Sequence, residues 1–239
     1  MSLGAVATLG FASCTNNDTN SEGGVLRIKL TTDTSVLTRA DVGIAAPTIE
    51  EFDLTVSATD ESYTNQWESI TELTSEEKFA TGDYIVTATC GDATAEGFDM
   101  PYFEATSSCR ILPTQTTLVN MVAKLANSGV RVSMTSAFVQ YFDEWNIELV
   151  SAADTHIPFV DNESRIAYIA PEPFSLNIDY VKPNGTEGTK RIDVANVTPC
   201  TVYHIRLDVN GGEVGAAQIV VSFDYSTDDE NIEIEIEEQ

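Results

Sequence analysis

A run of alternating apolar and polar residues, bounded on both sides by Gly-Asp pairs, constrains the fold of this chain more than any other feature. It extends over residues 84–90, between Gly82-Asp83 and Gly91-Asp92. A period of two is that of a β-strand with one buried face, and Gly-Asp pairs are typical of turns. We therefore expect a sheet that lies with one face against a core.

Similar alternation recurs along the rest of the chain, at residues 26–30, 52–58, 117–124 and 174–180. Many short strands separated by turn residues predict an all-β protein built from tandem β-sandwich domains of immunoglobulin-like design. One short helix is expected near residues 136–145. Four aromatic residues there have the spacing i, i+3, i+4, i+7 of one helix face, namely Phe138, Tyr141, Phe142 and Trp145.

Three blocks recur in the same order in the two halves of the chain. Residues 26–30 match 130–134, residues 51–56 match 144–149, and residues 84–88 match 203–207. Collinear repeats indicate two domains of related design. We expect an N-terminal domain at residues 24–127 and a C-terminal domain at residues 128–239.

Residues 1–23 have the features of a processing segment and a tether. A short apolar run ends in Phe11-Ala12-Ser13-Cys14, which has the form of a lipoprotein cleavage box. We therefore predict Cys14 as the lipidation site, through which the chain would be anchored to a membrane. No lysine or arginine precedes Arg27, although a signal peptide has a basic start, so a stray apolar leader is the alternative.

The chain is strongly acidic. It has 12 lysine and arginine residues against 38 aspartate and glutamate residues, and a formal net charge of −26. Such a field repels a phosphate backbone, which argues against nucleic acid as a partner. A general contribution to solubility explains the charge equally well.

Catalytic and metal-binding patterns are absent from the sequence. It contains two histidines, His156 and His204, and has no Gly-x-Ser-x-Gly motif and no cluster of Cys and His with zinc-ligand spacing. We predict that the protein is not an enzyme and uses neither a cofactor nor a metal. Cys90 and Cys109 occupy inward-facing strand positions, where they could form a disulfide or stay buried as free thiols.

Two further segments allow both a structural and a functional interpretation. Phe98, Tyr102 and Phe103 lie in an expected loop, where they could stack on sugar rings or cover the core. Residues 232–237 alternate strictly between isoleucine and glutamate. They fit either a charged edge strand or a strand donated to a neighbouring subunit.

Several of these segments together resemble an uncharacterised lipoprotein family of the Bacteroidetes. The resemblance is carried by the cleavage box at Cys14 and by residues 24–30, 38–42, 82–92, 97–103, 124–127 and 130–132. That family is distantly similar to the fimbrillin-type proteins of the same bacteria, which are two-domain, transthyretin-like β-sandwich lipoproteins. In those proteins, cleavage after an arginine behind the first strand frees a groove, and subunits polymerise by strand exchange.

The resemblance implies a place and a role for this chain. Arg39 follows the first expected strand and corresponds to the arginine at the processing site. We expect a non-catalytic lipoprotein of the cell envelope, lipid-anchored to the outer membrane, that acts in adhesion or as a pilus-related component. Its partners would be the membrane and other envelope proteins. The alternative is a glycan-binding accessory lipoprotein that uses Phe98, Tyr102 and Phe103 on host or dietary glycans.

Overall fold

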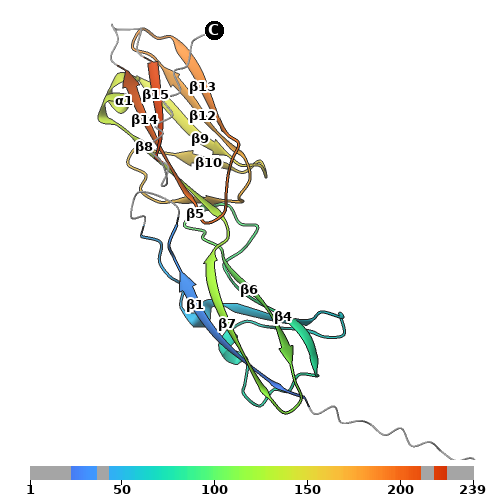
Figure 1. The fold of residues 1–239 in the computed structure, drawn as a ribbon. Coiled ribbons are helices and arrows are strands. Elements are labelled where there is room, and N and C mark those ends of the chain that lie inside the picture. The colour runs from blue at the N-terminus through green and yellow to red at the C-terminus, as the bar shows by residue number, and fades with distance from the viewer. Residues whose placement is uncertain (1–22, 37–42, 211–217, 225–239) are drawn as a thin grey trace, which may run out of the picture.

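The computed structural model describes residues 23–36, 43–210 and 218–224. It is an all-β molecule with one short α-helix, in which two sandwich-like lobes follow each other end to end (Figure 1). The expectation of β-sandwich architecture is confirmed.

The first lobe is a six-stranded mixed sheet that folds over on itself. Its strand order is β1-β7-β6-β4-β2-β3. The strands are β1 (Val25–Asp33), β2 (Asp53–Ala58), β3 (Thr64–Trp67), β4 (Gly82–Cys90), β6 (Phe103–Ile111) and β7 (Thr116–Leu125). Two single turns of 3-10 helix, η1 (Ile49–Glu51) and η2 (Ile70–Glu72), lie between strands.

Alternation in the sequence explains how this lobe closes. Strands β6 and β7 pair at Phe103 with Leu125 and at Glu104 with Lys124, and near their other ends the Thr117 hydroxyl donates to the carbonyl of Arg110 at 3.2 Å. The inward residues of the sheet, such as Leu54, Val86 and Met121, are buried in one shared core. The burial of these alternating side chains is the main favourable term that holds the lobe together.

The second lobe is a sandwich of two sheets with its own core. The first sheet has the order β10-β9-β12-β13, and the second has the order β15-β14-β8-β11-β5. The strands are β5 (Gly97–Phe98), β8 (Ser128–Met134), β9 (Glu144–Val150), β10 (His156–Phe159), β11 (Ala167–Ile169), β12 (Phe174–Val181), β13 (Glu187–Val194), β14 (Val202–Asn210) and β15 (Gln218–Asp224).

The two lobes share a strand pattern. The order β3-β2-β4-β6 of the first lobe recurs as β10-β9-β12-β13, and the parallel pair β1–β7 recurs as β8–β14. This agrees with two of the three sequence matches, those of β1 with β8 and of β2 with β9. The third match, of β4 with β14, is wrong, because the strand order equates β4 with β12. Alternation repeats every two residues, so it does not distinguish one strand from another.

The helix is shorter than expected. Helix α1 spans Ser136–Tyr141, and the hydroxyl of Thr135 caps it by accepting a hydrogen bond from the backbone N–H of Phe138. The helix ends at Phe142, and Trp145 belongs to β9. Trp145 nevertheless packs on the helix, with its ring centroid 6.3 Å from that of Phe138. The spacing of these aromatic residues therefore reflects their packing against one another in the core, and not their position on one helix of three turns.

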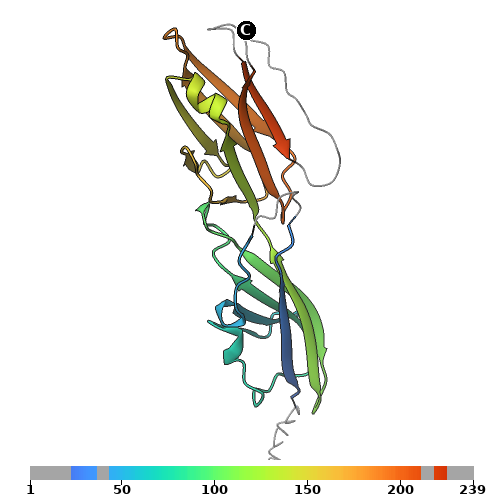
Figure 2. The same cartoon turned by 90° about the vertical axis from the view of Figure 1, so that its left-hand side faces the viewer.

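A short strand from the first half of the chain pairs within the second lobe. Strand β5 lies antiparallel to β11, with Phe98 opposite Ala167. Beside it, the Glu96 carboxylate accepts hydrogen bonds from the backbone N–H of Ala170, at 2.9 Å, and from the hydroxyl of Ser151. The segment around β5 therefore joins the lobes (Figure 2), and a domain boundary after residue 127 stays a prediction.

Candidate functional site

The three aromatic residues predicted to contact a ligand do not form one outward platform. Phe103 begins β6, is 1% exposed and belongs to the core of the first lobe, so its predicted ligand contact is wrong. Phe98 faces the second lobe, with its ring centroid 5.2 Å from that of Phe159, and the Arg165 guanidinium lies 4.3 Å above it. Only Tyr102 keeps a partly exposed ring without a packed aromatic neighbour among the described residues.

Tyr102 is held by polar contacts. Its hydroxyl donates to Oε2 of Glu104 at 3.1 Å, and its backbone N–H donates to Oδ1 of Asn127 at 3.2 Å. The amide of Asn127 in turn donates to the carbonyl of Met100 at 3.0 Å. Burial, together with the Glu104 carboxylate, raises the pKa of Tyr102 to about 12. These contacts position the loop where the lobes meet, which is a structural role.

Of the two alternatives for Cys90 and Cys109, a disulfide or free thiols, the structure shows free thiols. Cys90 lies opposite Phe103 and Cys109 lies opposite Tyr84, at the two ends of the β4–β6 ladder. At about 3.4 Å per residue their α-carbons are about 20 Å apart, well beyond the reach of a disulfide. The lipidation site Cys14, the processing site Arg39 and the acidic segment 232–237 lie outside the described residues.

The strand β1 presents the most distinctive surface of the first lobe. It pairs in parallel with β7 along its whole length, and no other described strand pairs with its second edge. At its start, the backbone of Gly24 bonds to Phe79 on this second edge, whereas the N–H of Val25 bonds to Gln115 on the β7 side. Because backbone groups alternate along a strand, those of Leu26, Ile28 and Leu30 point to the second edge.

A groove of about 320 Å³ runs beside this edge. Apolar side chains from β1, η1 and η2 line it, together with two hydroxyl groups; the lining residues are Leu26, Arg27, Ile28, Ile49, Ile70, Thr71, Leu73 and Ser75. Ile49 is 41% exposed although it is a large apolar residue. Unpaired backbone groups beside an apolar groove can accept an extended chain segment as an added strand.

The outward face of the β1–β7 pair carries positive charge. Arg27 and Lys29 project from β1 on this face, opposite Leu118 and Asn120 of β7. Both cations are exposed, and neither forms an ion pair with another residue of the described chain. Farther along the face, Lys124 lies 3.5 Å from Asp33 and is thereby paired.

The described residues show no arrangement that would hold a metal ion. Within residues 23–36, 43–210 and 218–224 there is no suitable group of three or more His, Cys, Asp or Glu side chains. His156 contacts two carboxylates, with Nδ1 2.8 Å from Glu148 and Nε2 3.5 Å from Asp154, but this cluster lies exposed on β10 and its preceding turn. None of the described helices combines the length and apolar character needed to span a membrane.

A family model matches almost the whole chain. It is described as a domain of unknown function, DUF4493, and it covers residues 17–238, which include both lobes. The chain belongs to this family. No curated protein matches it.

Several solved structures have a similar fold. The fimbrial anchor protein Mfa2 of Porphyromonas gingivalis is 13% identical, with a TM-score of 0.49 over 86% of this chain and 100% of that one. A fimbrial assembly protein of Parabacteroides distasonis is 10% identical, with a TM-score of 0.45 over 82% and 94%. A candidate adhesin of Bacteroides ovatus is 9% identical, with a TM-score of 0.44 over 86% and 93%.

In this DUF4493 chain, the sequence alone did not identify Arg27 and Lys29 of β1 as candidate functional residues. Its Arg27 and Lys29 are visible as the polar members of an alternating strand, but nothing local shows that they lack a partner. The parallel partner β7 begins at Thr116, far along the sequence. The only available signal was the rarity of cations in an acidic chain, of which two occur here within three residues.

Proposed function

We propose that this protein is a non-catalytic structural component of the cell envelope, pilus-related or adhesive, that joins other proteins by strand addition at β1. The observation that carries the proposal is the open edge of β1 beside its apolar groove. The three similar structures named above have TM-scores below 0.5, so the proposal rests on the architecture of this chain.

Strand addition suits the chemistry of this edge. An incoming segment would bond to the backbone groups of Leu26, Ile28 and Leu30, and its apolar side chains would enter the groove beside Ile49 and Leu73. Main-chain bonds supply affinity in such a mode, whereas the pockets for alternate side chains supply selectivity. A parallel edge strand also relies on its single neighbour, so β1 is a natural point of exchange.

Processing at Arg39 would change how β1 is held. Arg39 follows β1 in the sequence, and the proposed lipid anchor at Cys14 precedes it. After cleavage at Arg39, the anchor and β1 would stay on one short piece, held to the lobe without a covalent link by the β1–β7 ladder, the bridge between Gly24 and Phe79 and the core contacts of Leu26, Ile28 and Leu30. Cleavage would therefore allow β1 to be replaced by a strand from another molecule.

The proposal is tested by cleaving the purified chain with an arginine-specific protease and measuring its mass by light scattering after size exclusion. Treatment with the protease should increase the mass of the oligomers formed by the natural chain, whereas the Arg39→Ala variant should stay uncleaved at that position and show no increase. Cleavage at Arg39 that yields only nicked monomer would contradict polymerisation by strand exchange.

A pair of matched variants tests whether the groove beside β1 is the contact surface in the oligomers. Ile49→Glu places a charge in the groove, and Val160→Glu places the same charge on an exposed apolar residue of the second lobe, 59% exposed. Burying an unpaired carboxylate is costly, so Ile49→Glu should block the formation of oligomers and Val160→Glu should not. Equal assembly of both variants would remove the groove from the proposal.

A further inference from the structure

Two cations on the β1–β7 face stand out in a chain with a net charge of −26. Arg27 and Lys29 point outward from the same strand and are unpaired among the described residues. Two large apolar side chains of β7 share their face, Leu118 at 60% and Val122 at 52% exposure. We call these four residues the basic face. Exposed apolar residues with polar groups at their rim mark protein contacts, and arginine is enriched there.

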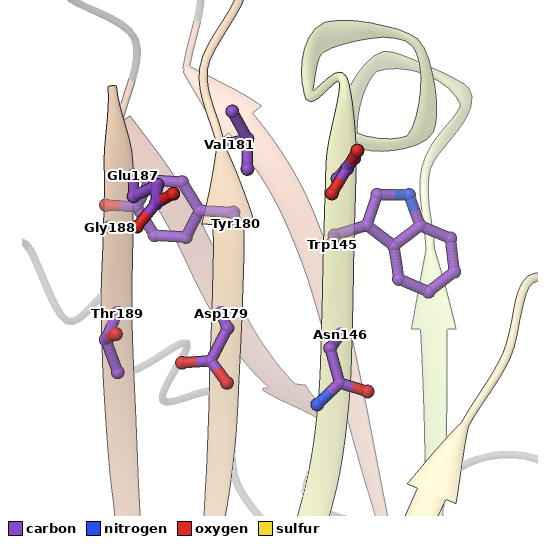
Figure 3. Close-up of a pocket in the computed structure, with 9 residues that line it drawn as sticks. Trp145, Asn146, Asp179, Tyr180, Val181, Glu187, Gly188 and Thr189 are labelled. Atoms are coloured by element: carbon purple, nitrogen blue, oxygen red, sulfur yellow. The ribbon is translucent and has the colours of Figure 1, made fainter. Parts of the chain in front are cut away.

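The second lobe has a surface hollow, complementary in charge to the basic face, at its end away from the first lobe. Its volume is about 540 Å³, and it lies on the sheet β10-β9-β12-β13 next to the β12–β13 turn. Glu144 and Glu187 flank Val181 in one cross-strand row, and Asn146 and Thr189 flank Asp179 in the next. We call this site the acidic hollow (Figure 3).

Alternation places the carboxylates of the acidic hollow on the outer side of the sheet. Trp145 lies between Glu144 and Asn146 and turns inward to Phe138, so its two neighbours turn outward. Tyr180 likewise turns inward to Phe142, with ring centroids 4.8 Å apart. None of Glu144, Asp179 and Glu187 forms an ion pair within the part of the chain that the structure describes.

The two surfaces lie toward opposite ends of an elongated molecule. Strand β1 starts at the far end of the first lobe, where Gly24 meets Phe79, and runs toward the second lobe. The β12–β13 turn lies at the far end of the second lobe (Figures 1 and 2). One copy therefore presents a basic apolar face at one end and an acidic hollow at the other.

We propose that the basic face of one copy docks on the acidic hollow of a second copy, so that molecules associate head to tail. A contact between two different patches leaves one patch of each kind free, and such contacts build open filaments when the rotation does not close. The inference rests on the proposed structural role. Its basic face shares Arg27 with the lining of the β1 groove, but the docking uses the outward face of β1–β7 and needs no cleavage at Arg39.

The charges of the two surfaces determine which part of one copy contacts which part of the next. Two copies of this chain repel each other over most of their surfaces, whereas the basic face offers two neighbouring unpaired cations to the carboxylates of a second copy. Local complementarity of this kind selects orientation and speeds association. It is also sensitive to salt, since the screening length falls from about 14 Å at 0.05 M to about 4 Å at 0.5 M ionic strength.

Sedimentation of the purified, uncleaved chain over a concentration series tests the inference. The dissociation constant of self-association should rise tenfold or more on going from low to high salt. The double variant Arg27→Glu with Lys29→Glu should raise it at least tenfold at low salt, and so should Glu144→Lys with Glu187→Lys. A chain that carries all four substitutions should associate again, because the charges of both surfaces are exchanged.

A single matched control distinguishes the effect of a charge on the basic face from the effect of the net charge of the chain. Arg27→Glu and Arg206→Glu change the net charge equally, and Arg206 is an exposed arginine on β14 of the second lobe, away from both surfaces. Arg206→Glu should leave the association unchanged. The inference would be overturned by a chain that stays monomeric at every concentration. It would also be overturned if the chain with all four charge substitutions did not regain self-association.

The outcomes also separate this inference from the proposed function. Oligomers that form only after cleavage at Arg39, and that tolerate reversal of Arg27 and Lys29, would support strand exchange and overturn head-to-tail docking. Association of the uncleaved chain that depends on these charges, without further growth after cleavage, would support docking and contradict strand exchange.

Discussion

Tyr102 and Phe103 are adjacent in the sequence but belong to different environments. Phe103 is the first residue of β6 and points into the core, whereas Tyr102 precedes the strand and rests beside Glu104. Because successive side chains of an extended segment point in opposite directions, adjacent aromatic residues rarely share one surface. A cluster in the sequence was therefore a poor indicator of a binding platform.

Alanine substitutions at these two positions should have very different effects on stability. Phe103→Ala removes a fully buried ring and should lower the free energy of unfolding by about 3–5 kcal/mol. Tyr102→Ala removes a partly exposed ring and one hydrogen bond at the surface, and should lower it by about 1 kcal/mol or less. Urea denaturation followed by fluorescence checks both. Similar losses at the two positions would contradict the assigned burial.

His156 should titrate above the usual range of a histidine. Its hydrogen bond to Glu148 and the charge of that carboxylate raise the pKa of His156 above 6.5, with a smaller effect from Asp154. A raised pKa means that the protonated form favours the folded state. This contribution is complete below the pKa of the unfolded chain and is lost as the pH rises through the folded value.

Proton NMR titration of the chain would measure this shift. Glu148→Gln should return the pKa of His156 toward 6.5, and Asp154→Asn should lower it less, because its oxygen lies 3.5 Å from the ring instead of 2.8 Å. An unchanged pKa in the Glu148→Gln variant would show that the contact does not persist in solution.

At the scale of elements, the sequence predicted strands better than their partners. Strands β2, β4 and β12 were identified because alternation is a local property. The pairing of β1 with β7 and the equivalence of β4 with β12 depend on how the whole sheet is ordered, which alternation does not encode. The two-residue strand β5 has no periodicity at all, and only the structure shows that it pairs with β11.

The segment before β5 acts as a clamp between the lobes. Glu96 accepts hydrogen bonds from the Ser151 hydroxyl and the Ala170 N–H, and Asp99 donates its backbone N–H to the carbonyl of Ile166 at 3.0 Å. Arg165, which pairs with Glu163 at 2.6 Å, covers the outer side of Phe98. Short elements of this kind depend on side-chain contacts, because their few backbone bonds do not hold them alone.

Removal of the Glu96 carboxylate should loosen this clamp. Glu96→Ala leaves the Ala170 N–H and the Ser151 hydroxyl without their acceptor, which should cost about 1–3 kcal/mol. Glu104→Ala, on the exposed outer side of β6, is the matched control and should cost less than about 1 kcal/mol. Hydrogen exchange of residues 96–99 and 166–170 checks the effect. Equal protection in both variants would assign the clamp to Phe98 alone.

At the scale of the whole molecule, the two lobes share residues both in their cores and in their sheets. The core of the first lobe includes Ile166, Tyr168 and Val202 of the second lobe. Conversely, residues 96–99 contribute β5, the ring of Phe98 and the Glu96 carboxylate to the second lobe. A cut after residue 127 therefore yields a second lobe that lacks part of its own sheet, although the repeat of the strand order places a boundary there.

This dependence predicts how the isolated second lobe behaves. Residues 128–239 alone should unfold at a lower temperature than the same lobe in the full chain, because β11 loses its pairing with β5 and Phe159 loses the contact with Phe98. A synthetic peptide of residues 92–101 should raise the midpoint, and the increase should grow with the logarithm of the peptide concentration above its Kd, since a ligand that binds only the folded state stabilises it by mass action. The same peptide with Phe98→Ala and Glu96→Ala should not. A fragment with the same midpoint of thermal unfolding as the full chain, and with no response to the peptide, would contradict this prediction. The domain boundary would then lie after residue 127, and β5 would be a surface contact that the second lobe does not need for its stability.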